Sequence, residues 1–258
     1  GAYATILLST SAHVPLPLSI VLAGILTSFF GFLIGFPTLK LEGDYLAIVT
    51  LGFGEIIRVV LVNLKRWTGG PNGKQFPTVL TLDPALAYTV IVGTLVALIV
   101  LLQNFIRSTY GRAILAVRED EIAANAAGID VFKYKMLGFV VASFVAGIGG
   151  ALYAPFIGFV KPDQASFTKS IDYLIFVVLG GMGSTTGSVL AAFVLTYVQE
   201  FLRFLQNYRL LIYPVILIIV MIFRPQGLMG MKEFSFVRTF DKIASLLARG
   251  KKTEARNG

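Results

Sequence analysis

The sequence predicts an all-α, polytopic membrane protein with about eight helices that cross or half-cross the bilayer. Of its 258 residues, 56% are hydrophobic and only 14% are charged, whereas a soluble domain usually carries about 25% charged residues. The mean hydropathy is +0.79. Several stretches without Asp, Glu, Lys or Arg reach the roughly 20 residues of helix that cross a bilayer core. The solvent of this chain must therefore be largely lipid.

The first uncharged stretch is interrupted by His13, Pro15 and Pro17. Because proline separates helices more readily than it continues them, we expect two helices here, at about 1–11 and 16–36. The chain opens inside this apolar stretch without an initiator Met, so we also expect further sequence to precede it.

Three further spans follow, at 45–64, 84–106 and 136–160. The first is apolar apart from Glu55 and Arg58, which lie three residues apart and so share one helix face. Charge inside a membrane is costly, so we expect these two side chains to neutralise each other. Two roles remain open for them: a structural ion pair at a helix interface, or a polar point in a translocation pathway.

The stretch 173–199 is uncharged but too long for one span. Its 27 residues would form a helix of about 40 Å, which exceeds the bilayer core. Within it, LGGMGSTTGSVL carries the glycines Gly180, Gly181, Gly183 and Gly187. We predict a half-helix at about 171–179, a glycine-rich turn and a second helix at about 188–202. Alternatively, the GxxxG spacing of the last two glycines only lets helices pack closely.

The distribution of Lys and Arg supports the broken helix. Residues 107–135 contain five Lys or Arg residues and the chain after Phe223 contains eight, while 161–172 and 200–209 contain two each. The positive-inside rule therefore places the first two segments in the cytoplasm, and an even number of crossings must separate them. If 136–160, 173–199 and a last span from about Phe204 each crossed once, the number of crossings would be three, which is odd. The last span can begin near Phe204 because Arg209 can snorkel to the interface. One of the three must therefore be broken.

Composition also excludes several kinds of chemistry. The chain has no Cys and a single His, so Fe–S clusters, thiolate chemistry and a metal site built from Cys or paired His are not expected. The nearest candidate for a Walker A motif, TGGPNGKQ, lacks its first Gly and the Ser or Thr after Lys74. We expect no metal, no cofactor and no enzymatic activity in this chain. The net charge is +8, and many of the Lys and Arg residues border long apolar runs. This charge therefore indicates membrane topology and not a nucleic-acid partner.

The polar stretch 107–135 is rich in alanine, with six alanines between residues 113 and 127 and Gly128 after them. Alanine favours helix, and glycine suits the position just after a helix end. We predict a short cytoplasmic surface helix that docks into a groove of another protein. A solvated, charged helix without a partner is the alternative.

Residues 231–258 form a separate basic tail after the membrane domain, 1–230. Its larger apolar residues recur at spacings of four, three and four, so it predicts an amphipathic helix on the cytoplasmic membrane surface, disordered after Arg249. A docking arm for another subunit is the alternative.

These stretches carry a family resemblance. GRAILAVREDEIAANAAGID resembles the coupling loop by which ABC importer permeases contact their ATPases. GAYA, LKLEGDYLAIVTLGFGEIIR, TGGPNG, VLGGMGSTTGSVLAA and RPQGLMG, in that order, resemble the branched-chain amino-acid permeases, and especially their M-type branch. The residues that the resemblance places at the ATPase are Arg112, Arg118, Glu119, Asp120, Ala123, Ala124 and Gly128.

The resemblance implies a multi-pass subunit of an importer in the bacterial cytoplasmic membrane, working by alternating access. Its expected partners are two cytoplasmic ATPases that carry ATP and Mg, a second related permease, an extracytoplasmic binding protein for Leu, Ile or Val, and membrane lipid. A urea or short-chain amide permease of the same family remains an alternative, as does an ion-coupled secondary transporter.

Overall fold

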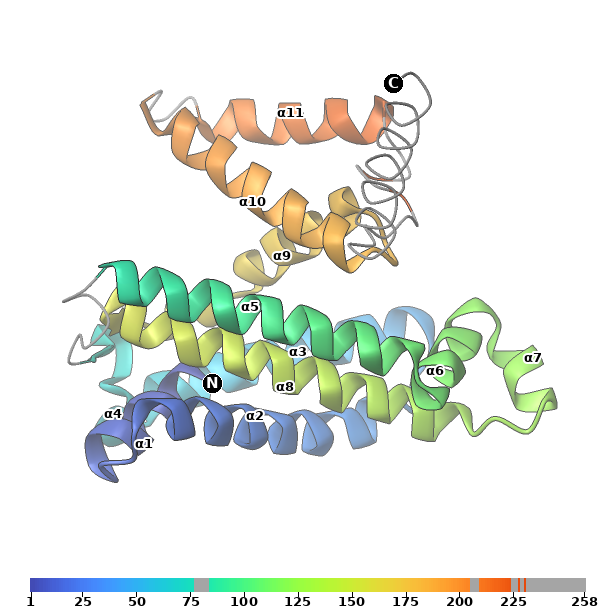
Figure 1. Cartoon of the computed structure of the whole chain (residues 1–258), viewed down its shortest axis with the longest axis horizontal. Helices are drawn as coiled ribbons and strands as arrows, with labels where there is room; N and C mark the ends of the chain where they lie inside the picture. Colours follow the sequence, from blue (N-terminus) through green and yellow to red (C-terminus); the bar gives the residue numbers. More distant parts are fainter. Residues whose placement is uncertain (77–83, 205–208, 224–226, 228–229, 231–258) are drawn as a thin grey trace, which may run out of the picture. The chain divides into compact units, whose positions relative to one another are not determined.

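A computed structural model describes residues 1–76, 84–204, 209–223, 227 and 230. The described part is helical apart from two strands of two residues each, which confirms the all-α class. Five helices are long and apolar enough to cross a membrane. The chain divides into two compact units, Gly1–Lys169 and Ser170–Gly258, which are described separately below (Figure 1).

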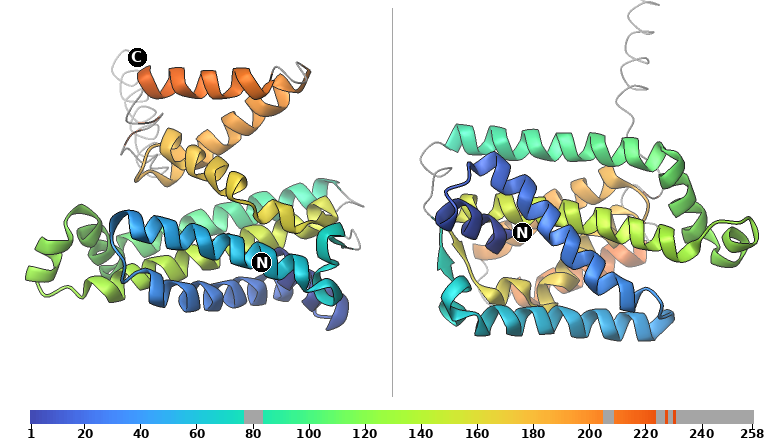
Figure 2. Two further views of the ribbon diagram at one scale, coloured as in Figure 1. Left: turned by 180° about the vertical axis from the view of Figure 1, so that it is seen from behind. Right: turned by 90° about the horizontal axis from the view of Figure 1, so that it is seen from below.

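The first unit is built from helices that run back and forth between two ends. These are α1 (Ala2–Ser11), α2 (Leu16–Thr38), α3 (Gly43–Asn63), α5 (Pro84–Arg107) and α8 (Val131–Ile157). At one end lie α6 (Thr109–Glu119) and α7 (Glu121–Ala126). At the other lie α4 (Lys65–Thr68), η1 (Gly70–Asn72), β1 (Lys74–Gln75), β2 (Phe159–Val160) and η2 (Pro162–Ala165) (Figure 2).

The antiparallel helices α2 and α8 form the main seam of the first unit. A Cβ added to Gly31 would lie 2.3 Å from Ser143 Oγ, and one added to Gly147 would lie 2.7 Å from the Thr27 side chain. Ser28 Oγ also donates a hydrogen bond to the Val140 carbonyl, 3.2 Å away. In lipid the hydrophobic effect does not drive helices together, so such close backbone contact and interhelical hydrogen bonds hold the seam.

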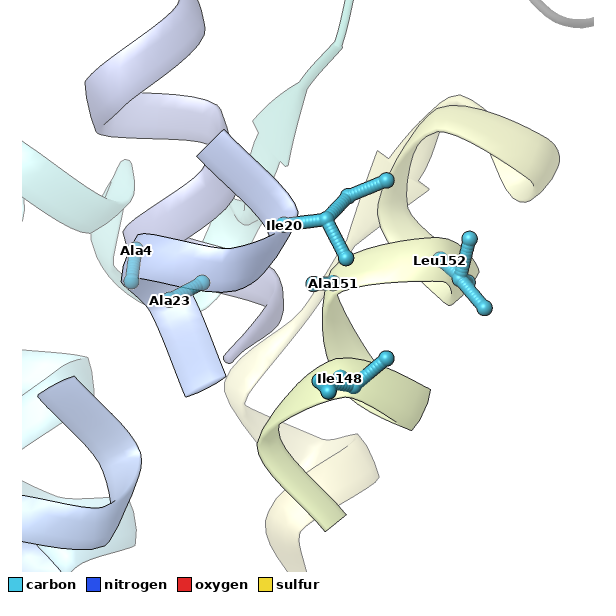
Figure 3. Packing of buried hydrophobic residues seen from close by; sticks show 6 residues of the cluster. All are labelled: Ala4, Ile20, Ala23, Ile148, Ala151 and Leu152. Carbon is cyan, nitrogen blue, oxygen red and sulfur yellow. The ribbon is translucent and has the colours of Figure 1, made fainter. Parts of the chain in front are cut away.

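Small residues also join α1 to this seam. Ala4 of α1, Ala23 of α2 and Ala151 of α8 are buried together with three larger neighbours (Figure 3), namely Ile20, Ile148 and Leu152. The three helices therefore share a buried apolar cluster in which each contributes an alanine.

The strand pair lies at the end opposite α6 and α7, which we call the strand-pair end. Lys74 pairs with Val160 and Gln75 with Phe159 in antiparallel register, and the Phe76 N–H donates to Gly158 O at 2.9 Å. The pair joins the chain after α3 to the chain after α8.

The second unit is formed by the end of α9 (Phe167–Gly180), α10 (Thr185–Phe201) and α11 (Arg209–Phe223). Leu179, Leu195 and Leu217, one from each helix, form its buried apolar cluster. The predicted break of the long uncharged stretch is present, because α9 ends at Gly180 and α10 begins at Thr185.

Three predicted boundaries were wrong because side-chain caps set them. Asp130 Oδ1 accepts a hydrogen bond from the Lys133 N–H at 3.0 Å, so α8 begins five residues before the predicted 136. Ser184 caps α10 in the same way, through the Gly187 N–H, so this helix begins at Thr185 instead of 188. The single helix predicted within 107–135 is two helices, separated at Asp120.

Replacing Gly147 by Leu should separate α2 from α8 and destabilise the protein by about 2 kcal/mol or more, because the side chain would have to displace Thr27. The matched control is Gly149→Leu on the same helix, where an added Cβ has no atom within 4 Å. Thermal unfolding of the purified protein in detergent measures the difference. Equal melting temperatures for the two variants would contradict the proposed role of the seam.

Candidate functional site

The helices α6 and α7 begin at a sharp bend after α5. Ser108 Oγ accepts a hydrogen bond from the Gly111 N–H at 3.2 Å and donates one to Phe105 O at 2.6 Å. A Cβ on Gly111 would lie 2.3 Å from the carbonyl oxygens of both Phe105 and Ile106. Only glycine fits this position, so the direction in which α6 leaves α5 is fixed by the local sequence.

Both ends of α7 are capped by its own sequence. Asp120 Oδ1 accepts hydrogen bonds from the N–H groups of Ile122 and Ala123, each at 2.9 Å. At the other end Gly128 has φ +81°, its N–H donates to Asn125 O, and the Ile129 N–H donates to Ala124 O. These two bonds form a Schellman motif, which confirms that the helix ends where Gly128 predicts. A six-residue helix is marginal by itself, and the two caps stabilise it.

Contacts with α8 hold α6 and α7 in place. Glu121 Oε2 and Lys135 Nζ form an ion pair at 2.6 Å. Val117 of α6 and Ala124 of α7 are each only 4% exposed. We therefore expect the two short helices to move together with α8.

The outer face of α6 and α7 carries the other predicted coupling residues. Arg118 and Glu119 form an ion pair and are both largely exposed. Arg112 lies 3.4 Å from the Thr109 hydroxyl. The sequence analysis did not single out Ile122, which is 84% exposed in the first turn of α7. An isolated Ile within the charged run REDEIAA was the signal that could have identified it.

The glycine break in the second unit combines the two roles that its sequence left open. Gly181 and Gly183 both have φ +109°, a conformation that other residues rarely adopt. Gly180 and Gly187 pack against each other: a Cβ on Gly187 would lie 2.3 Å from Gly180 O. The glycines therefore break the helix and also let α9 and α10 approach closely.

The chain after α11 returns to this break. A Cβ on Gly181 would lie 2.4 Å from Gly230 O, and one on Gly227 would lie 2.6 Å from Gly181 Cα. The break and the end of α11 thus occupy the same end of the second unit.

The charged pair on α3 is present. Arg58 Nε lies 2.7 Å from Glu55 Oε2, and the two side chains are 32% and 43% exposed. The Glu55 carboxylate also lies near the Phe167 N–H, and Arg58 is attracted by Asp163 of η2. The predicted mutual neutralisation is confirmed, and the pair lies in the half of α3 nearer the strand-pair end.

One apolar groove lies between α5 and α8, lined by side chains that include Leu95, Leu152 and Phe156. Its lining is almost entirely apolar, so we do not assign it to a translocation pathway. Among the residues that the structure describes, no group of three or more His, Cys, Asp or Glu could hold a metal ion.

Comparison with known proteins decides the family. Residues 1–223 match the family described as the permease component of branched-chain amino acid transport systems. The chain belongs to this family. It is thus a multi-pass membrane permease component, and such a component is not itself an enzyme.

Individual relatives agree with this assignment. The chain is 37% identical to the high-affinity branched-chain amino acid transport system permease protein LivM of Escherichia coli K12, over 90% of this chain and 61% of the relative. It is 28% identical to LivH of the same organism, over 65% of this chain and 54% of that protein. The autoinducer 2 import system permease protein LsrC of Klebsiella pneumoniae is 30% identical, over 60% of this chain and 47% of LsrC. No solved structure matches the chain significantly.

Replacing Gly181 by Ala should destabilise the second unit by about 1–3 kcal/mol, because alanine is strained at φ +109° and its Cβ would contact Gly230 O. Gly93→Ala on α5 is the control, since an added Cβ there has no atom within 4 Å. Thermal unfolding should therefore separate the two variants. A Gly181→Ala protein as stable as the wild type would refute the contact between the break and the chain after α11.

Proposed function

We propose that this chain is a membrane-spanning subunit of an ATP-driven importer, which moves branched-chain amino acids across the cytoplasmic membrane by alternating access. The observation that carries the proposal is the pair α6–α7: two short helices capped by their own sequence, held on α8, and presenting the exposed Ile122. A loop without a partner would need none of these features.

The relatives support the solute and the partners. The chain spans 61% of the length of LivM, so the transport activity, the solute and the assembly are proposals. LivM and LivH of one organism both match, which favours a second related permease in the assembly. LsrC, named for autoinducer 2, is matched over a smaller share of the chain than LivM, and so branched-chain amino acids are the better assignment than other solutes.

The remaining partners follow from the same proposal. An extracytoplasmic binding protein would deliver the solute, and two cytoplasmic ATPases would bind ATP and Mg. Arg112, Arg118, Glu119 and Ala123 would contact an ATPase, and Asp120, Ala124 and Gly128 would shape and seat the helix that does so. An ion-coupled carrier would have no use for this helix pair.

Alternating access then has a mechanical basis in the first unit. When the ATPases close, they would push on α6 and α7. The ion pair Glu121–Lys135 would pass this movement to α8, and the glycine seam would carry α2 with it. Helix α3 has no buried residue, and its Glu55–Arg58 pair would be a polar point in the translocation pathway.

The proposed membrane topology has eight transmembrane or half-membrane segments: α1, α2, α3, α5, α8, α9, α10 and α11. The α6–α7 end faces the cytoplasm and the strand-pair end faces outside. The break at Gly180 to Gly187 turns back near the cytoplasmic side, as its contact with the chain after α11 favours. The membrane domain comprises residues 1–230, and the basic tail 231–258, which lies outside the described residues, would rest on the cytoplasmic membrane surface.

The double variant Asp120→Lys, Gly128→Pro removes both caps of α7. It should abolish ATP-driven uptake and co-purification of the ATPase while the protein still reaches the membrane, because each cap is worth about 1 kcal/mol to a marginal helix. Asp120→Asn, which keeps a capping side chain, should retain most of both activities. Normal ATPase co-purification with the double variant would rule out α7 as the contact.

Cysteine labelling tests the direction of the broken helix, since the chain contains no other Cys. Met182 at the break is 71% exposed and Phe204 after α10 is 69% exposed. Single cysteines at these two positions should react with a membrane-impermeant thiol reagent from the cytoplasmic and the outer side, respectively. Labelling of both from one side would refute the half-membrane segment.

A further inference from the structure

The charged pair on α3 lies deep within a helix that is otherwise apolar along its span. Within the described part of the chain, five helices are long and apolar enough to cross a membrane. Glu55 is the one charged residue of these five helices that lies more than five residues from both ends, and Arg58 follows one turn later. Charge at such depth is costly against lipid and normally faces the interior of the bundle or a water-filled cavity. The face of α3 that carries the pair therefore belongs on an aqueous pathway.

The pair is held in position and still has hydrogen-bonding capacity left. Arg58 Nε donates to Glu55 Oε2 at 2.7 Å, while the Phe167 N–H lies near the carboxylate and Asp163 attracts the guanidinium. Because the bond to Glu55 uses Nε, the two terminal nitrogens of Arg58 can bind a second carboxylate in bidentate fashion. Both side chains are partly exposed. The pair is thus a preorganised cation and anion that a small solute can reach.

Two glycines leave space beside the pair. Gly52 lies three residues before Glu55 and Gly54 lies four before Arg58, so each is one helical turn from a charged residue. A Cβ added to either glycine has no atom within 4 Å, whereas the glycines of the α2–α8 seam are in close contact with the opposite helix. Glycine inside a helix costs about 1 kcal/mol relative to alanine. No contact in the described part of the chain requires that cost here, but a solute that approaches the backbone of α3 would.

Apolar side chains lie along the same face of α3, on both sides of the pair. Leu51 precedes Glu55 by four residues and Val59 follows it by four, and both are exposed. One cation, one anion, a gap at the backbone and aliphatic neighbours are therefore combined within about three helical turns. This combination is complementary to a zwitterionic amino acid with an aliphatic side chain.

We propose that this part of α3 binds the amino acid directly as it passes: the Arg58 guanidinium takes the α-carboxylate and the Glu55 carboxylate takes the α-ammonium. This inference rests on the proposed function. Both bonds are charge-assisted, and a zwitterion adds one charge of each sign, so no net charge is left uncompensated within the membrane. Leu51 and Val59 would contact the branched side chain of the solute. The site assigns part of the solute specificity to the permease itself.

Exchanging the two charges separates solute binding from a merely structural ion pair. Glu55→Arg together with Arg58→Glu keeps an ion pair at the same spacing but reverses its direction. In the assembled importer in proteoliposomes, supplied with its binding protein, leucine turnover should fall at least about tenfold, because both ends of the solute then meet like charge. The melting temperature, ATPase co-purification and basal ATPase rate should stay at wild-type values. Wild-type uptake by the exchanged variant would overturn the proposal.

A second variant decides the matter even where the exchanged protein fails to fold. Gly54→Ala places a methyl group where the fold leaves open space, so it should preserve stability but narrow the gap beside Arg58. Leucine is longer than valine by one methylene, so the ratio of leucine to valine turnover should fall at least about threefold. Gly93→Ala on α5, whose added Cβ also has no atom within 4 Å, is the control and should leave the ratio unchanged. An unchanged ratio for Gly54→Ala, with or without an equal loss for both solutes, refutes the site.

The proposed function is judged separately, from ATP-driven uptake by the wild type and co-purification of the ATPase. An importer that passes those two tests, but whose leucine turnover is indifferent to both the exchanged pair and Gly54→Ala, refutes only the solute site on α3.

Discussion

The close approach of α2 and α8 is the contact on which the rest of the first unit depends. In a bilayer, exclusion of water gives no net preference for helix contact over lipid contact, so helices associate where their surfaces fit and where hydrogen bonds form between them. Gly31 leaves room for the Ser143 side chain, and Gly147 leaves room for the Thr27 side chain, so the two helices can approach closely. Helix α1 packs on the same two helices, and the strand pair follows from the position at which α8 ends.

The elements that the sequence predicted well are those that lipid itself dictates. Prolines 15 and 17 and the long apolar stretches located α1, α2, α3 and α5 to within a few residues, because a span must be apolar and continuous whatever it packs against. The break at Gly180 was also predictable, since the uncharged stretch was longer than a bilayer. These features depend on composition and length alone.

The features that sequence reasoning missed depend on individual hydrogen bonds or on distant partners. Alanine content favoured one helix through 113–127, but the Asp120 carboxylate accepts hydrogen bonds from the N–H groups of Ile122 and Ala123 and so divides it into two. Nothing near Lys74 indicates that it pairs with Val160.

The two ends of the first unit are built differently. At the α6–α7 end, charges of both signs surround the exposed Ile122 on a capped helix that is ion-paired to α8, and in the proposed mechanism this end receives the force. At the other end, the pairing of β1 with β2 fixes the chain after α3 against the chain after α8.

The central claim is that α7 receives that force from an ATPase, and a photo-crosslinker attached at Ile122 tests it most directly. With the chain's only cysteine at position 122, the assembled importer should yield an adduct with the ATPase subunit whose amount changes between the nucleotide-free and ATP-bound states. The same reagent at Leu101 on α5, which is 61% exposed, serves as the control and should give none. Absence of an ATPase adduct from Ile122, or its labelling by an impermeant reagent from outside, would contradict the account.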